Sequence, residues 1–318
     1  QCPLYNAPGL PISWNKNQYQ EGTNEYVAVR PELKKQIEEL YRKHPEEARD
    51  SFGEDPFEVK NILKYWVLSE KQEFHVIPTD TINIHIDKDA LLRSGIMLPK
   101  TIRHLKGEDL KDAIPDKLYI PLTDIRMLTK VDLLMLEMLA NCNWERPLYL
   151  AISVGSVSKL KFDNYFVQEG LAFRFTPFDY KKWGDVGENR LYAVDVERLY
   201  DNVMNRYKYG GLDTPGLYLD ETTLRTCWYH RRLFAQLAKE LIAQGDNERA
   251  KKVLAYAEQV IPGYNVPETH ESGSYDIATA YAALGEKTKA VTLAVHLIAE
   301  AEDYINWAFS LGNGRTGM

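Results

Sequence analysis

The sequence predicts an α+β fold, in which a region of mixed helices and strands, residues 1–210, is followed by an all-α region of helical hairpins, residues 211–318. Two observations predict this division. Before residue 195, apolar and polar residues alternate in several short segments, as they do in strands with one buried face. After residue 195 the apolar residues follow helical spacing, and one helix-turn-helix pattern occurs twice.

The first elements of the chain are predicted from helix breakers and from the spacing of apolar residues. Residues 1–30 are rich in proline and glycine, which predicts loops. Two amphipathic helices follow at 31–44 and 56–69, and each starts with a proline, which suits the first helical turn. Strict alternation of apolar and polar residues then predicts a strand at 81–87.

The predicted strand at 81–87 has isoleucines on one face and polar residues on the other. We expect the three isoleucines to face the core and Asn83, His85 and Asp87 to face solvent. Metal binding or acid–base chemistry can use a histidine and an aspartate on one face. A solvated strand face explains these residues more simply, so we assign them no functional role.

Further strands and one more helix complete the mixed region. Strands are predicted at 117–122 and 146–154, and a hairpin at 165–175 has a glycine near its turn. Between the first two strands, residues 129–142 form a predicted helix. A threonine and an aspartate in its first turn are suited to capping the free backbone N–H groups there.

The C-terminal region contains the most specific pattern in the chain. A tight turn at 244–250 joins two helices, and residues 284–290 repeat it forty residues later. Glycine adopts the left-handed conformation that ends a helix, and a small residue after it lets two antiparallel helices pack closely. The pattern resembles the tetratricopeptide repeat, whose usual length is about 34 residues, and the insertion at 263–270 accounts for the excess. The matching residues are Gly245, Ala250, Ala257 and Pro262 in one copy and Tyr281, Gly285 and Ala290 in the next.

Charge and composition exclude several classes of protein. The net charge is −7 and the lysines and arginines form no block, so we expect no binding to nucleic acid, which depends on neutralising phosphates. Apolar residues make up 44% of the chain, which excludes a disordered protein. No stretch of about 18 apolar residues occurs, so no segment of these 318 residues is predicted to span a membrane.

No catalytic, cofactor or metal motif is recognisable. The three cysteines, Cys2, Cys142 and Cys227, are far apart in sequence and predict neither a disulfide framework nor a metal site. The chain contains no phosphate-binding glycine loop, dinucleotide fingerprint, zinc-protease motif, nucleophile elbow or calcium loop. We therefore predict no catalytic residue, no cofactor and no metal. Carboxylates are numerous, so a two-carboxylate glycosidase stays open.

The loop at 143–147 is the most distinctive candidate for recognition. It combines Trp144, Glu145 and Arg146, an aromatic plate beside two opposite charges, which sugar or peptide recognition can use. In the alternative interpretation the loop is a structural turn, in which Trp144 fills the core and Glu145 pairs locally. The structural interpretation is the more common of the two for such a loop.

Further candidates lie in the helical region. His230 and Arg231 begin a basic run on the first long helix, and the guanidinium could bind an anionic group. Ordinary helical surface charge is the alternative explanation. We add Tyr264 and Asn265 of the insertion and Tyr281 of the second repeat to the candidate recognition surface.

Six segments of the chain stand out beyond these motifs, namely 11–14, 128–130, 143–147 with the strand after it, 200–204, 218–221 and 261–267. Together they resemble the soluble C-terminal region of a family of large bacterial envelope proteins of unknown function. In that family a polytopic membrane region, similar to GT-C-type glycosyltransferases, precedes a soluble tail that ends in tetratricopeptide-like helices. Its eukaryotic relatives are protein O-mannosyltransferases.

The resemblance implies a fragment of a larger membrane protein on the extracytoplasmic, periplasmic face of a bacterial inner membrane. The chain begins with Gln1 and no signal sequence, which fits a fragment cut from its membrane region. The resemblance places the sugar donor and the catalytic acid in the missing part, so we expect this chain to be non-catalytic and the full-length protein to be a glycosyltransferase.

The expected partners are a protein or glycan acceptor, which this domain positions, and the membrane, through the missing N-terminal region. Two alternatives stay open from the sequence. One is a stand-alone helical-repeat module that binds a peptide in a concave groove near Tyr275 and Tyr281. The other is an independent carbohydrate-active enzyme, which requires a cleft with two facing carboxylates.

Overall fold

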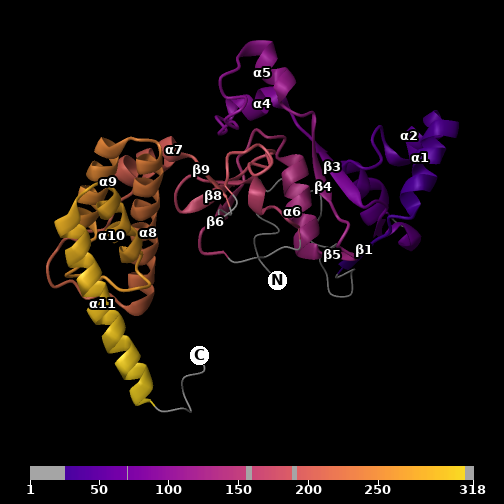
Figure 1. Cartoon of the computed structure of the whole chain (residues 1–318). Coiled ribbons are helices and arrows are strands. Elements are labelled where there is room, and N and C mark those ends of the chain that lie inside the picture. The colour runs from indigo at the N-terminus through magenta and orange to yellow at the C-terminus, as the bar shows by residue number, and fades with distance from the viewer. Residues whose placement is uncertain (1–25, 70, 155–159, 188–191, 312–318) are drawn as a thin grey trace. The chain divides into compact units, whose positions relative to one another are not determined.

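A computed structural model describes residues 26–69, 71–154, 160–187 and 192–311 of the chain (Figure 1). The fold is α+β with a helical C-terminal region, as the sequence predicts. The predicted N-terminal loop as far as residue 25, and Cys2 with it, lie outside the described residues.

The chain forms two compact units. Residues 1–167 and 174–193 make up the mixed unit, and residues 168–173 and 194–318 make up the helical unit. The compact units thus divide at Ala193 and Val194, while the boundary near residue 210 stays a prediction about domains. We describe each unit separately.

Two small sheets organise the mixed unit. In the first, β1 (Tyr26–Val29) pairs in parallel with β2 (Val76–Ile77) and antiparallel with β5 (Met127–Thr129). In the second, β3 (Thr81–His85) pairs antiparallel with β4 (Lys117–Pro121). Strand β1 carries no extended alternation in the sequence and was not predicted.

Short helices cover these sheets. The predicted helix at 31–44 is present as α1, and a further helix, α2, begins at Pro45, because proline has no N–H to continue the first helix and suits the start of the second. The predicted helix at 56–69 continues as a π-helical turn after one α-helical turn. The helical segments are α1 (Leu33–Lys43), α2 (Pro45–Phe52), α3 (Val59–Ile62), η3 (Leu63–Val67), η4 (Gln72–Phe74), α4 (Lys88–Arg93), α5 (Gly107–Ala113), α6 (Lys130–Asn141) and η5 (Asp163–Tyr165).

Helix α6 begins and packs as the sequence predicts. Thr129 and Asp132 form a capping box, in which each side chain accepts a hydrogen bond from the backbone N–H of the other residue. The helix then buries leucines against α3 and β3, including Leu133 and Leu136. Burial of such side chains stabilises the unit by roughly 1.5 to 3 kcal/mol each.

The prediction for the polar face of β3 is wrong at one residue. The isoleucines face the core and His85 is exposed, but Asn83 is buried. The backbone of Asn83 forms a bridge with Glu58 and donates a hydrogen bond to the Phe57 carbonyl at 2.9 Å. A segment from a distant part of the sequence therefore lies along the strand at this residue. Asp87 is the N-cap of α4, and its carboxylate accepts a hydrogen bond from the Ala90 N–H.

A third sheet has the strand order β6-β8-β7-β9. The predicted hairpin at 165–175 is present, with Gly170 in its turn. The predicted strand at 146–154 is shorter in the structure. The strands are β6 (Tyr149–Ala151), β7 (Phe166–Gln168), β8 (Ala172–Phe175) and β9 (Ala193–Val194).

The helical unit contains two long helical hairpins (Figure 1). Helix α8 packs on α9, α10 packs on α11, and α8 also contacts α10. Gly245 and Gly285 have φ of +79° and +77° after α8 and α10, which is the left-handed conformation expected of a helix end. The helical segments are α7 (Val196–Asp201), η6 (Asn202–Arg206), α8 (Glu221–Ala243), α9 (Asn247–Val260), α10 (Ser274–Ala283) and α11 (Lys287–Ser310).

Alanines of the repeat pattern lie where the paired helices meet. Ala250, Ala257 and Ala290 are all buried, which is what close packing of antiparallel helices requires. Within the described ranges, no helix combines the length and the apolar character needed to cross a bilayer.

Candidate binding pocket

Trp144 occupies a structural position in the mixed unit. Its side chain is 6% exposed, stacks on Phe175 with ring centroids 6.3 Å apart, and donates a hydrogen bond from Nε1 to the His85 carbonyl at 2.8 Å. Asn143 and Trp144 both have positive φ, which forms the tight turn between α6 and the strand that follows. Of the two interpretations of this loop, the core-filling one describes Trp144.

The neighbours of Trp144 remain on the surface. Glu145 and Arg146 are both exposed. The cavity beside the loop has a volume of about 10 Å³, which is about the smallest that holds one water molecule. A recognition role for Glu145 and Arg146 stays a prediction.

Arg231 of α8 is buried and joins this helix to the loop that follows α9. Its side chain is 3% exposed and donates hydrogen bonds to the carbonyls of Ile261, Val266 and Pro267, at 3.2, 2.6 and 2.9 Å. Burial lowers the pKa of this guanidinium. Arg231 thus fixes the loop after α9 to α8, and these backbone contacts occupy the fork that an anionic ligand would need.

The same loop is clamped to a second loop by Tyr264 and Asn265. The Tyr264 hydroxyl donates to the Asp213 carbonyl at 2.7 Å. The buried Asn265 amide donates to the carbonyls of Leu212 and Thr214, at 2.7 and 2.6 Å. The sequence predicted these two residues as recognition groups, and the structure places them where they hold residues 212–214.

His230 supports two tyrosines that precede this second loop. Its ring makes edge contacts with Tyr207 and Tyr209, at centroid distances of 5.6 and 5.4 Å. Burial lowers the pKa of His230, so the neutral imidazole is favoured. Four of the predicted residues, His230, Arg231, Tyr264 and Asn265, therefore surround one part of the helical unit.

That part contains an open pocket of about 430 Å³, within the size range of small-molecule sites. We call it the tyrosine pocket. Three half-buried tyrosines and three exposed polar side chains line it, from the segment 204–213 and from α9. The lining residues are Met204, Asn205, Tyr207, Lys208, Tyr209, Gly211, Asp213, Tyr256 and Val260.

Ring contacts and hydrogen bonds to neighbouring residues hold the tyrosines of this pocket in place. Tyr209 packs against Tyr256 and Phe234, and its hydroxyl donates to the Val203 carbonyl at 2.7 Å. Burial raises the pKa of Tyr209, so its hydroxyl stays protonated at neutral pH. The Tyr207 hydroxyl accepts a hydrogen bond from the Leu171 N–H at 3.0 Å.

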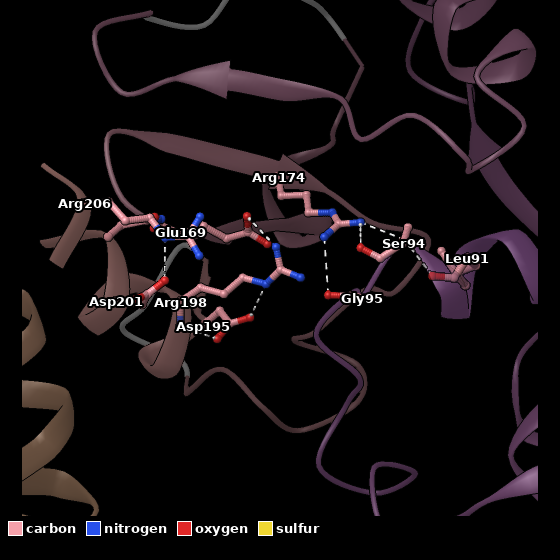
Figure 2. A network of polar contacts seen from close by, with 10 residues as sticks. Leu91, Ser94, Gly95, Glu169, Arg174, Asp195, Arg198, Asp201 and Arg206 are labelled. Atoms are coloured by element: carbon pink, nitrogen blue, oxygen red, sulfur yellow. Dashed lines mark hydrogen bonds and ion pairs between the residues drawn. The ribbon is translucent and has the colours of Figure 1, made fainter.

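Polar contacts hold the turn that meets Tyr207. Figure 2 shows Arg198 between Glu169 and Asp195, at 3.6 and 3.5 Å, and Arg206 paired with Asp201. The Asn202 amide also donates to the Glu169 carbonyl at 2.6 Å. The turn at 169–170 is therefore held against α7 and η6.

A separate cluster in Figure 2 belongs to the mixed unit. There the buried guanidinium of Arg174 donates to the Ser94 carbonyl and hydroxyl, at 3.0 and 2.7 Å, and to the Gly95 carbonyl at 3.4 Å. These contacts anchor β8 to the end of α4, a structural role.

Gly170 is expected to be essential for the position of Tyr207. A Cβ at Gly170 would lie 2.1 Å from the Tyr207 hydroxyl oxygen. The backbone of Gly170 has a φ of +154°, a conformation that residues with a side chain rarely adopt. We expect Gly170→Ala to lower the free energy of unfolding by roughly 2 to 3 kcal/mol through overpacking and backbone strain. Urea unfolding followed by circular dichroism measures this change.

The matched control for Gly170→Ala is Gly216→Ala. Gly216 has a φ of +80° but open space where its Cβ would be, so only backbone strain of roughly 1 kcal/mol is expected. Equal losses of stability in the two variants would contradict the proposed clash with Tyr207.

Tyr281, the last predicted residue, lies elsewhere in the unit. It is buried, and its hydroxyl donates to Glu258, which also accepts from Lys289. Burial and this hydrogen bond raise the pKa of Tyr281. Tyr281 therefore joins α10 to α9. Because its ring is buried, Tyr281 does not line the peptide groove that the sequence predicted near this residue. Tyr275, by contrast, is exposed.

The main pocket residues Tyr207, Tyr209 and Tyr256 were not predicted. The segment Tyr-Lys-Tyr-Gly-Gly at 207–211 was the available signal, because two tyrosines before flexible glycines suit a binding loop. The contribution of α9 to this loop has no signal in the sequence. In the part of the chain that the structure describes, no three histidine, cysteine or carboxylate side chains gather as a metal site requires.

Comparisons with known proteins give one match. Residues 1–197 match a family model described as TMEM260-associated domain 2. No curated protein and no solved structure matches the chain significantly. The family match thus covers the mixed unit and ends before the tyrosine pocket.

Proposed function

The chain belongs to the TMEM260-associated domain 2 family, and from this premise we propose that it is a non-catalytic binding domain that positions protein or glycan acceptors for a membrane-bound glycosyltransferase. The family is one of unknown function. Its description associates the domain with TMEM260, and the resemblance of several segments to the soluble tails of GT-C-like envelope proteins supports the same role.

The tyrosine pocket is the observation that carries this proposal. Sugar rings present C–H groups on their faces and hydroxyls at their edges, so a site for them combines aromatic rings with polar side chains. The pocket offers the rings of Tyr207, Tyr209 and Tyr256 beside an amide, an ammonium and a carboxylate. The same groups also suit a serine- or threonine-rich peptide segment.

The lining of the pocket favours binding over hydrolysis. A glycosidase requires two carboxylates that face each other across the bond to be cleaved. The pocket is lined by one carboxylate, that of Asp213. For this reason we propose that the tyrosine pocket binds an acceptor and does not hydrolyse it.

The membrane connection is part of the proposal. We propose that the domain is held at the extracytoplasmic face of a bacterial inner membrane by a polytopic region of the same protein, which contributes the sugar donor site. The support for this part is the segment resemblance alone.

A binding experiment tests the proposed function. The chain would be applied to a glycan array and to serine- and threonine-rich peptides, and hits would be titrated by calorimetry. We expect Tyr256→Ala and Lys208→Ala to weaken binding about 10-fold or more, because each removes a group that lines the pocket. Circular dichroism would confirm that the variants are folded.

The control is Tyr218→Ala, which removes a tyrosine of the same unit that is 88% exposed and outside the pocket. Its binding should match that of the unchanged chain. Binding of peptides alone would favour the stand-alone interaction module. Absence of binding to every glycan and peptide, or binding that the pocket variants leave unchanged, would overturn the proposal.

A further inference from the structure

Helix α11 carries an apolar stripe that no part of the described chain covers. The stripe consists of five large apolar residues, which are between 51% and 77% exposed. The five residues are Val291, Val295, Ile298, Ile305 and Phe309. They extend over about 27 Å of helix, and contiguous exposed patches of this kind mark interaction surfaces.

The stripe is distinct from the face that α11 uses within its own unit. Ala290, Leu293 and Leu297 are the buried residues of this helix, and α11 packs on α10. Beyond residue 300, every described residue of α11 is exposed or half-buried. The helix therefore has a second apolar face. Its last turns bury no residue, and their tertiary contact is that of the Tyr304 ring with His270, at a centroid distance of 5.4 Å.

The spacing of the stripe is that of a helix that packs lengthwise on another helix. Val291, Ile298 and Ile305 are seven residues apart, and Val295, Glu302 and Phe309 form a second row with the same interval. Two rows with this interval form the seam of a coiled coil. Alanines at 294, 301 and 308 flank the seam and permit a close approach.

The charges of α11 indicate which helix fits. Beside or within the stripe, the N-terminal half carries Lys287 and the C-terminal half carries Glu302. Lys289 and Glu300 are bonded to other residues of their own unit and do not face the stripe. An antiparallel second α11 brings opposite charges together along both halves, whereas a parallel one brings like charges together. Antiparallel packing also sets the helix dipoles in opposition.

We propose that this chain forms a two-fold symmetric dimer in which α11 of one copy packs antiparallel on α11 of a second copy. Each copy contributes the same apolar stripe, as a two-fold interface requires. Glu302 interrupts the seam with a charge, so the dimer is reversible and its orientation is specified at the cost of affinity.

Sedimentation of the full chain over a range of concentrations tests the proposal. We expect a monomer–dimer equilibrium, which Ile298→Glu weakens more than about 10-fold and Glu302→Leu tightens about 10-fold. Tyr218→Glu places the same charge at an exposed site outside α11, so this control should leave the equilibrium unchanged. All variants are made at exposed positions, and circular dichroism checks their folding.

Charge reversal tests the antiparallel orientation. Lys287→Glu and Glu302→Lys should each weaken the dimer at low salt, and the double variant should restore it. Failure of the double variant to restore the dimer would overturn the antiparallel arrangement. A chain that stays monomeric at all concentrations, or a dimer that Ile298→Glu leaves intact, would overturn the interface. Binding of the monomer to neutral phosphatidylcholine vesicles through the stripe would assign this face to a lipid surface instead.

Discussion

Replacement of Trp144 by alanine is expected to lower the free energy of unfolding by about 3 to 5 kcal/mol. The side chain is 6% exposed and stacked on Phe175, so its removal leaves a cavity that the mixed unit cannot fill. The substitution also removes the indole N–H that the His85 carbonyl accepts. Urea unfolding, followed by tryptophan-independent far-ultraviolet circular dichroism, measures the change.

Glu145→Ala is the matched control for Trp144→Ala. The two residues are adjacent in the same loop, but Glu145 is exposed, so its substitution should change stability by less than about 0.5 kcal/mol. A Trp144→Ala variant with unchanged stability and reduced binding of an acceptor would contradict the structural role and favour recognition by this loop.

Arg231→Met is expected to destabilise the helical unit by roughly 3 to 5 kcal/mol, because it leaves three carbonyls, two of them in buried hydrogen bonds, without their donor. The carbonyls belong to Ile261, Val266 and Pro267, in the loop that also carries Tyr264 and Asn265. Loss of the Arg231 hydrogen bonds should therefore also loosen residues 212–214 beside the tyrosine pocket. Urea unfolding measures the stability, and amide hydrogen exchange reports the loosening.

Arg232→Met provides the comparison for Arg231→Met, since it removes the same charge from the next residue of α8. Arg232 is exposed and donates to one carbonyl, that of Glu271, so a loss below about 1 kcal/mol is expected. Equal losses of stability in the two variants would show that the positive charge stabilises this part of α8, and not the buried hydrogen bonds of Arg231.

Local features of this fold could be predicted from the sequence. The capping box of α6 was predicted from Thr129 and Asp132, which are three residues apart. The ends of α8 and α10 were predicted from Gly245 and Gly285. Caps, turns and the periodicity of single elements depend on neighbours within about four residues, so the sequence contains all the information that they require.

Features that join distant segments could not be predicted in this way. Asn83 has the spacing of an exposed residue, but it is buried, and its backbone pairs with that of Glu58. Strand β1 has a short and unremarkable sequence, and pairing with β2 and β5 on either side makes it a strand. Backbone hydrogen bonding in a sheet depends on partners that only the fold brings together.

The candidate site shows the same contrast between features that depend on nearby residues and features that depend on distant segments. The sequence by itself determined the α+β class, the helical hairpins and the presence of unusual residues at His230, Arg231, Tyr264 and Asn265. The tertiary structure decided that these four support a pocket, and that Tyr256 of α9 joins the loop at 204–213 to line it. The physical reason is that the role of a polar or aromatic side chain follows from what surrounds it. Long-range packing of segments about 50 residues apart determines those surroundings, and the periodicity of either segment does not.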